Sequence, residues 1–402
     1  MKFNELEAGK IGTDDVISLY LGSEKLWPAI IAASTNYLKK LFGKNDGSTA
    51  WGDNFGYSVA ISNGVVAICD PATWDDNPVP GHASEIFLYD AVGTYLRSVY
   101  VDWDAADRNN DFGQYNLAMN ATHIGAGHNY GTDQYFLWDI NGTLIQKIER
   151  PVDFTGTAFA GTAAMTSTKL FIGAYNSDIT AGVYVYDMTA TYLHKITNPD
   201  ASGGFGGSIY ANENYLMISS ATGVHVYNSS TYAFIRTIPI GGGTIGFGFS
   251  MAQAGAYFYV CDYRQAQGIE DSIPDAGAVY MYNVADGTFH MEIQDTNPTQ
   301  GGNFGYSIDV DNNYLVVGQP SRNNQVAAEG WLHVYNLDGS LVAEVRPDGD
   351  VNATYAGWSV AIENGTIVMG AWNDNEGDPD NLANTQYAGS AYLWDVTTMI
   401  AV

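Results

Sequence analysis

Charged residues are scarce in this sequence, and basic residues are the scarcest. Only 15% of the 402 residues are Asp, Glu, Lys or Arg, against about a quarter in typical soluble domains. There are 44 acidic and 16 basic residues, so the formal net charge is −28. Such an acidic surface repels phosphate groups. We therefore expect neither nucleic acid nor an anionic membrane surface as a partner.

Cysteine is almost absent. The two cysteines, Cys69 and Cys261, occupy matching positions in "VAICD" and "FYVCD", but these segments lie far apart in the chain. A disulfide needs its two Cα atoms within about 7 Å of each other. We therefore expect two buried free thiols, a common state for cysteine in protein interiors.

Long apolar runs are also missing. No stretch of about 18 apolar residues occurs, so we expect no membrane-spanning helix. The first residues, "MKFNELEAGKIGTDD", lack the apolar core of a signal peptide. If the protein acts outside a cell, we expect it to leave by a route other than ordinary secretion.

Familiar catalytic motifs are missing as well. No pair of the seven histidines has zinc-ligand spacing with a third ligand nearby. The sequence contains no G-x-S-x-G elbow, no H-E-x-x-H and no phosphate-binding glycine loop. We therefore expect no catalytic residues and no enzymatic activity.

A repeat dominates what is present. The segment Asn54–Pro71, "NFGYSVAISNGVVAICDP", recurs with the same pattern at Asn303–Pro320, "NFGYSIDVDNNYLVVGQP". Related starts bring the total to seven, with a mean spacing of about 50 residues. The seven starts are Phe55-Gly56-Tyr57-Ser58, Phe112-Gly113-Gln114-Tyr115, Phe159-Ala160-Gly161-Thr162, Phe205-Gly206-Gly207-Ser208, Phe247-Gly248-Phe249-Ser250, Phe304-Gly305-Tyr306-Ser307 and Ala356-Gly357-Trp358-Ser359.

Each unit follows one plan of four short strands. Two β-prone runs flank a tight turn, as in "VAISNGVVAI", and a variable loop follows. A third run ends in an aromatic residue and then Asp or Asn, and a fourth run follows a turn. The repeated aromatic residues, which we expect to pack between units, are Tyr89, Trp138, Tyr186, Tyr227, Tyr282, Tyr335 and Trp394. Four strands in about 50 residues are typical of a β-propeller blade.

The sequence therefore predicts an all-β, seven-bladed β-propeller. The last unit stops after its third strand, and residues 36–42, "NYLKKLF", match the missing fourth strand. We expect these residues to complete blade seven and close the ring, which removes open sheet edges. The predicted division is an N-terminal extension at residues 1–28 and a propeller at residues 29–402.

The repeat resembles the FG-GAP repeats of integrin-like seven-bladed propellers. The resemblance covers roughly residues 36–402, and "IGAG", "FIGAY", "VVGQP" and "VMGAW" stand in the G-A-P position. Blades of that family often carry calcium loops, but this chain has no clean copy. The nearest stretches are "WNDNEGDPD" (372–380) and "DWDAADRNND" (102–111). In the first, Asp374, Glu376 and Asp378 supply hard oxygen ligands suited to Ca²⁺. A solvated acidic loop is the alternative, so we expect no cofactor and keep Ca²⁺ as the one candidate.

The N-terminal stretch "VISLYLGSEKLWP" resembles short segments of bacteriophage virion and tail structural proteins. It reads as a small strand–turn–strand piece that cannot bury its apolar face alone. Tyr20, Leu21, Leu26, Trp27 and Pro28 are therefore candidate anchor residues for another virion protein. The alternative is that they pack on the propeller itself.

Tryptophans in the predicted loops could contact sugars. Trp74, Trp103 and Trp372 each lie next to acidic residues, in "WDDN", "DWD" and "WNDN". An aromatic ring beside polar groups suits a carbohydrate, although a tryptophan beside an aspartate is also common on ordinary surfaces.

Three functions remain open from the sequence. The first is a non-enzymatic virion structural protein, tail- or fibre-associated, whose propeller is architectural or attaches to a host surface. It would bind other virion proteins, a host glycan or further copies of itself. The second is a glycan-binding or glycan-cleaving propeller, since a pair of acids for glycoside cleavage would be hard to recognise among so many. The third is an integrin-like adhesion module on a cell surface.

Overall fold

The computed structural model describes the repeat region apart from several loops. The described residues are 37–43, 54–71, 84–100, 112–128, 133–156, 158–175, 180–200, 203–240, 246–268, 272–322, 329–347, 354–374 and 389–400, with the backbone of 10–11, 14–15, 20–21 and 24–25.

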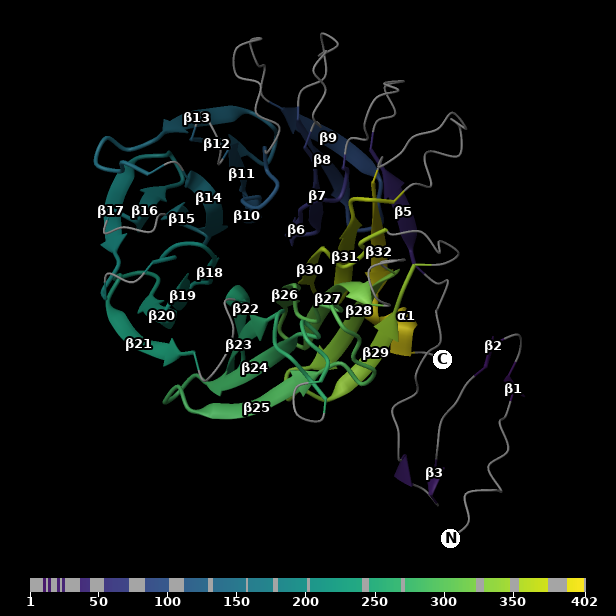
Figure 1. The fold of residues 1–402 in the computed structure, drawn as a ribbon. Helices are drawn as coiled ribbons and strands as arrows, with labels where there is room; N and C mark the ends of the chain where they lie inside the picture. The colour runs from purple at the N-terminus through teal and green to yellow at the C-terminus, as the bar shows by residue number, and fades with distance from the viewer. Residues whose placement is uncertain are drawn as a thin grey trace.

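Seven four-stranded antiparallel sheets surround one axis, which confirms the predicted β-propeller (Figure 1). In each sheet the first strand lies nearest the axis and the fourth on the outer rim. Blade 1 contains β6 (Val59–Ser62), β7 (Val65–Asp70), β8 (Glu85–Asp90) and β9 (Tyr95–Tyr100). Blade 2 contains β10 (Ala118–Met119), β11 (His123–His128), β12 (Gln134–Asp139) and β13 (Leu144–Glu149). Blade 3 contains β14 (Ala158–Met165), β15 (Lys169–Tyr175), β16 (Gly182–Asp187) and β17 (Tyr192–Thr197).

The next three blades repeat the same order. Blade 4 contains β18 (Ile209–Ala211), β19 (Tyr215–Ser220), β20 (Gly223–Asn228) and β21 (Phe234–Pro239). Blade 5 contains β22 (Phe247–Ala254), β23 (Tyr257–Asp262), β24 (Ala278–Asn283) and β25 (Phe289–Gln294). Blade 6 contains β26 (Ser307–Val310), β27 (Tyr314–Arg322), β28 (Glu329–Asn336) and β29 (Leu341–Val345).

Blade 7 joins the two ends of the repeat region. It contains β30 (Ser359–Glu363), β31 (Thr366–Ala371), β32 (Ser390–Asp395) and, as its outer strand, β5 (Lys39–Phe42). This confirms that the N-terminal strand closes the ring. The ammonium of Lys40 in β5 lies 2.8 Å from the buried carboxylate of Asp374, so an ion pair reinforces the strand pairing.

Two small hairpins are described, by their backbone alone, before the propeller. Strand β1 (Lys10–Ile11) pairs with β2 (Asp14–Asp15), and β3 (Tyr20–Leu21) pairs with β4 (Glu24–Lys25). The second hairpin shows a strand–turn–strand arrangement, but its second strand falls on Glu24–Lys25, within the stretch "GSEK" that was predicted to turn. Of the anchor candidates, Leu26, Trp27 and Pro28 lie outside the described residues. In the described part of the chain the one helix, α1 (Val396–Ile400), is too short to cross a membrane.

The hydrophobic core lies between the blades. Phe55 of blade 1, for example, is fully buried against Val66 and Ile68 of its own blade and Val368 and Leu393 of blade 7. The repeated Tyr and Trp residues are also buried, as predicted: none is more than 8% exposed. Each blade therefore needs its neighbour to complete its core, which explains why the same eighteen residues recur.

Small residues occupy one position on the second strand of every blade. These residues are Cys69, Gly127, Gly173, Ser219, Cys261, Gly318 and Gly370. A Cβ added at Gly370 would overlap the carbonyl oxygen of Gly56 in the next blade, and Gly318 faces Gly357 in the same way. The two cysteines are free and buried, as predicted, because they take this position in their blades.

In several blades the hydroxyl at the end of the repeated motif bonds to the next blade. In blade 2 the residue at this position is Tyr115, and the neighbouring amide of Asn116 donates instead to the carbonyl of Ala160 at 2.5 Å. The hydroxyl bonds to motif carbonyls are Ser58 to Gly113 (2.5 Å), Thr162 to Gly206 (2.8 Å) and Ser307 to Gly357 (2.9 Å). The Ser or Thr of the motif is therefore an inter-blade contact.

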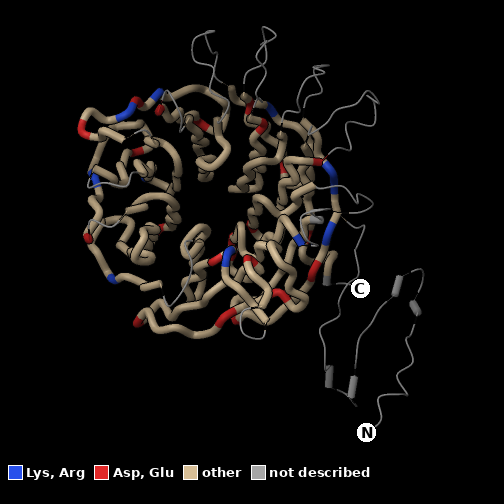
Figure 2. Tube along the Cα trace, in the orientation of Figure 1, with Lys and Arg blue, Asp and Glu red and all other residues tan. Residues whose placement is uncertain are grey.

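Basic side chains of the outer strands form a second set of contacts between blades. Each donates to a carbonyl in the turn before the outer strand of the next blade. The bonds are Lys39 to Gly93 (2.7 Å), Arg97 to Ile140 (2.7 Å) and Arg236 to Ala285 (3.0 Å). In Figure 2, several Lys and Arg positions, coloured blue, lie along the outer rim of the backbone trace. Several of the few basic residues in the chain are thus used to fasten neighbouring blades.

One acidic contact between blades should make stability depend on pH. Asp309 in β26 accepts the N–H of Ile362 in β30 at 2.9 Å. Burial, together with the nearby acids Asp311 and Glu363, raises the pKa of Asp309 to about 7. The folded state then binds more protons than the unfolded state between about pH 4 and 7, so stability falls as pH rises through this window.

We expect Asp309→Asn to remove that pH dependence. Between pH 5 and pH 8 the unfolding free energy of the wild type should fall by about 2 kcal/mol more than that of the variant. Urea unfolding of both proteins at the two pH values measures this difference. Equal pH dependence in the two proteins would contradict the raised pKa.

Candidate binding pocket on the propeller axis

A pocket of about 430 Å³ lies where the inner strands of all seven blades begin. This volume falls within the roughly 300–1,000 Å³ of small-molecule sites. Its wall includes the variable third residue of the repeated motif, which sits between the glycine and the serine. From blade 1 to blade 7, the residues at this position are Tyr57, Gln114, Gly161, Gly207, Phe249, Tyr306 and Trp358.

Local backbone geometry brings these residues to the axis. In blade 1 the N–H of Tyr57 bonds the carbonyl of Asn54 at 3.1 Å, and Gly56 between them has φ of 88°. A hydrogen bond across four residues with positive φ at the third defines a type II turn. The turn reverses the chain after the buried phenylalanine and delivers the next side chain to the axis. In blade 3 the equivalent residue is Ala160, which has φ of 64° and lies at a bulge in β14.

Aromatic rings form a continuous arc along part of the wall. The ring centroids of Phe249 and Tyr306 lie 4.9 Å apart, and those of Tyr306 and Trp358 lie 4.4 Å apart. Tyr57 continues the arc at 5.4 Å from both Trp358 and Tyr115. These residues come from five consecutive blades, in the order 5, 6, 7, 1 and 2. We call them the aromatic arc.

One of the three predicted sugar-contact residues supports this arc. The ring of Trp372 lies 5.7 Å from Tyr57 and 5.6 Å from Trp358, and it stacks on Tyr355 at 5.3 Å. It is not itself among the residues that line the pocket. Trp74 and Trp103 lie outside the described part of the chain.

The opposite wall is small and polar. Blades 3 and 4 contribute Gly161 and Gly207, together with the hydroxyl residues Thr162 and Ser208. Tyr175, 47% exposed, stands at this side of the rim. The pocket is therefore one-sided, because five blades contribute larger side chains at the motif position and two adjacent blades contribute none.

The pocket is electrically neutral. None of its described lining residues has a charged side chain. Burial, with the nearby hydroxyls of Tyr115 and Tyr263, raises the pKa of Tyr306 far above its usual value, so this phenol stays protonated. The site contrasts with the net charge of −28 carried by the whole chain.

Several polar groups on the wall are available to a ligand. Among the described residues, the hydroxyls of Ser208 and Tyr306 have no hydrogen-bond partner. The oxygens of Ser250 and Ser359 accept the backbone N–H groups of Ile308 and Val59, each at 3.0 Å, which leaves their O–H hydrogens free to donate. The pocket thus combines flat apolar rings with unused hydroxyls.

This pocket was not predicted from the sequence. The Phe and the glycine of the motif have packing roles that the repeat indicates, but the residue between glycine and serine has no such role. The sequence feature that could have indicated the pocket is the variability of that one position. It is aromatic in blades 1, 5, 6 and 7 and glycine in blades 3 and 4. Packing between blades requires the flanking residues and leaves this side chain free to vary.

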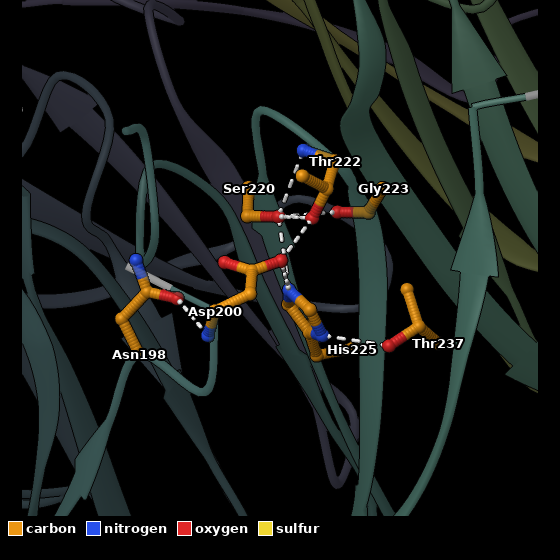
Figure 3. A network of polar contacts seen from close by, with 7 residues as sticks. All are labelled: Asn198, Asp200, Ser220, Thr222, Gly223, His225 and Thr237. Atoms are coloured by element: carbon orange, nitrogen blue, oxygen red, sulfur yellow. Dashed lines mark hydrogen bonds and ion pairs between the residues drawn. The ribbon is translucent and has the colours of Figure 1, made fainter. Parts of the chain in front are cut away.

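A Ser-His-Asp cluster in blade 4 does not form a catalytic triad (Figure 3). Ser220 Oγ and Asp200 Oδ2 both approach the same nitrogen of His225, Nε2, at 2.9 Å and 3.7 Å. The other nitrogen, Nδ1, faces the hydroxyl of Thr237 at 2.9 Å. A triad needs the acid and the nucleophile on opposite ring nitrogens. Burial also lowers the pKa of His225, although Asp200 partly opposes this.

Other blades show that this cluster is a variant of a structural contact. In blade 3 a tyrosine takes the position of the histidine, and Tyr184 and Lys195 both bond Asp153 at 2.9 Å. Blade 7 repeats this with Tyr392, Lys40 and Asp374. We therefore interpret the polar cluster of blade 4 as part of the fold.

Blade 6 has a buried ionic network at the equivalent place. Ligand atoms of Asp295, His333 and Glu344 lie within 4.8 Å of one another, as a metal site would require. The guanidinium of Arg322 already lies 3.0 Å from Asp295 and 3.7 Å from Glu344. Burial alone would raise the pKa of Glu344. The hydrogen bond and charge of His333 and the charge of Arg322 have a larger effect and lower this pKa to about 2. Arg322 thus supplies the positive charge that a metal ion would bring.

Of the three predicted calcium ligands, only Asp374 lies within the described residues. Asp374 is fully buried, and its carboxylate accepts bonds from Tyr392 and Ser390 and pairs with Lys40. It therefore contributes to ring closure. Glu376 and Asp378 fall in a segment that the structure leaves undescribed, so the calcium loop remains a prediction.

The fold and the pocket define the chain as a seven-bladed β-propeller with a neutral, aromatic site on its axis. No known protein-family model matches the chain, and no curated protein matches it significantly in sequence.

Proposed function

We propose that this protein is a non-enzymatic recognition module of a bacteriophage virion. Its propeller would be displayed by the N-terminal segment and would bind a ligand of the host surface in the axial pocket. The observation that carries the proposal is the pocket itself, whose wall combines an aromatic arc with unused hydroxyls.

The composition of the pocket favours binding over catalysis. General acid–base chemistry needs a group such as His, Asp or Glu within reach of the substrate. The described lining residues include none of these side chains and no cysteine. Hydrolysis of a glycoside in particular would need two carboxyl groups facing the scissile bond.

The position of the closing strand favours display. Strand β5 is the outer strand of blade 7, so the chain reaches the propeller at its rim (Figure 1). The pocket, in contrast, is lined by residues at the starts of the inner strands. A partner bound to residues 1–28 would then leave the pocket accessible. Tyr20, Leu21, Leu26, Trp27 and Pro28 are the residues that we propose contact another virion protein or a further copy of this chain.

We expect the full-length protein to fractionate with purified particles of the phage that encodes it. A version lacking residues 1–28 should be lost from the particles, because the apolar anchor would be gone. Quantitative immunoblotting of density-gradient fractions measures both. The truncated protein keeps β5, so an unchanged thermal unfolding transition is the control for its fold.

Two results would contradict parts of this proposal. Absence of the full-length protein from intact particles would exclude a virion component. Retention of the truncated protein would place the binding surface on the propeller and exclude residues 1–28 as the anchor.

A further inference from the structure

We infer that the axial pocket binds one neutral sugar unit, which enters on the side of blades 3 and 4 and lies against the aromatic arc. This inference rests on the proposed recognition function and specifies its ligand. The arc (Phe249, Tyr306, Trp358, Tyr57 and Tyr115) and the glycine side (Gly161 and Gly207) have complementary roles in it.

The asymmetry of the ring provides the space for a ligand. A propeller that only needed to fill its axis could place similar side chains at all seven motif positions. Here Gly161 and Gly207 stand in adjacent blades and both line the pocket, so one side of its wall lacks two side chains. Gly207 is exposed and its φ is not positive, and a Cβ there would lie 3.3 Å from the ring of Tyr175, which borders this side of the pocket.

The aromatic arc suits the C–H face of a sugar ring. Aromatic rings carry negative charge on their faces and positive charge at their edges. The C–H groups of a pyranose are weakly positive, so they pack favourably on an aromatic face. Tyr115 is 48% exposed and Phe249 is 39% exposed, so large apolar side chains of the arc are accessible.

Hydroxyl groups around the pocket suit the hydroxyl groups of the same ligand. The hydroxyls of Ser208 and Tyr306 can both donate and accept, and Ser250 and Ser359 can each donate one hydrogen. A purely apolar ligand would leave these groups unpaired on binding, which is costly. A polyhydroxylated ring with one apolar face can both pack on the aromatic rings and pair with the hydroxyl groups.

The charge of the site selects against other ligand classes. No described lining residue is Lys or Arg, so a phosphate, sulfate or carboxylate would be desolvated without a partner. A quaternary ammonium ion could use the aromatic faces through cation–π attraction. It could not use the four hydroxyl groups, and for this reason we favour the sugar.

We expect binding of at least one neutral monosaccharide to the full-length protein. The probes are glucose, galactose, mannose and N-acetylglucosamine, with choline and glucose 6-phosphate as charged comparisons, titrated by calorimetry. Tyr115→Ala should weaken the binding at least tenfold by removing an exposed ring of the arc. Gly161→Gln should do the same by placing in blade 3 the side chain that blade 2 carries as Gln114.

Further variants separate binding from folding. Tyr192→Ala removes a tyrosine that is 54% exposed on the outer strand β17, away from the pocket, and should bind like the wild type. Ser208→Ala changes one unpartnered hydroxyl and should weaken binding several-fold without changing the melting temperature. Each variant is compared with the wild type by thermal unfolding before titration.

The outcomes distinguish this inference from the proposed function. No sugar binding, tighter binding of choline, or equal binding by Tyr115→Ala and the wild type would each overturn the inference. Such results would leave particle association, measured separately, intact. Sugar binding by a protein absent from particles would support the pocket assignment and overturn display on a virion.

Discussion

Gly370→Ala should destabilise the propeller by about 3 kcal/mol or more, the upper end of what overpacking usually costs. The added methyl group would overlap the backbone carbonyl oxygen of Gly56, at the contact between blades 7 and 1. The methyl group is attached directly to the backbone of Gly370, so neither atom belongs to a flexible side chain. Rigid backbone cannot move aside as a flexible side chain can. Chemical denaturation of the variant and the wild type measures the loss in unfolding free energy.

Gly203→Ala is the matched control for this substitution. A Cβ at Gly203 would meet nothing within 4 Å, and its φ is not positive. Its unfolding free energy should stay within about 0.5 kcal/mol of the wild type. A Gly370→Ala protein as stable as this control would show that the blades are not packed as closely as the structure indicates.

Lys40→Met should cost about 3 kcal/mol, because it leaves the charge of Asp374 buried without its partner. The side chain of Lys40 is 10% exposed and that of Asp374 is fully buried, with 2.8 Å between ammonium and carboxylate. Removing one member of a buried pair costs about 3–5 kcal/mol. Since Lys40 belongs to the closing strand, the unfolding transition should also become less cooperative.

Two comparisons test this interpretation of Lys40. Lys147→Met removes an exposed lysine whose partner, Glu149, is 62% exposed, and it should cost less than about 1 kcal/mol. The double variant Lys40→Met with Asp374→Asn should recover part of the lost stability by removing the orphaned charge. If the double variant is less stable than Lys40→Met alone, the buried charge is not the cause of the loss.

The repeat made the architecture predictable from the sequence. Strand order, blade number and the fourth strand supplied by residues near Lys39 all follow from short local patterns that recur seven times. A four-stranded blade cannot bury its apolar faces alone, so repetition implies a ring, and a ring with an incomplete last unit implies closure by the other end. The buried state of Cys69 and Cys261 follows from the same alignment of units.

The axial pocket was not predictable in this way. Trp372 was expected to face a sugar, and the structure places it in contact with the arc, next to Tyr57 and Trp358. In the sequence these three residues lie in units at opposite ends of the chain. Nothing local indicates that a residue between glycine and serine in one blade faces the same residue in six others.

The sequence by itself determined the blades, because hydrophobic alternation, turn residues and the glycine of the motif act within a single unit of about 50 residues. The tertiary structure alone decided what the centre of the ring contains. Ring closure brings seven equivalent positions to one axis. Only there do the four aromatic rings of blades 5, 6, 7 and 1 and the two glycines of blades 3 and 4 line the same pocket.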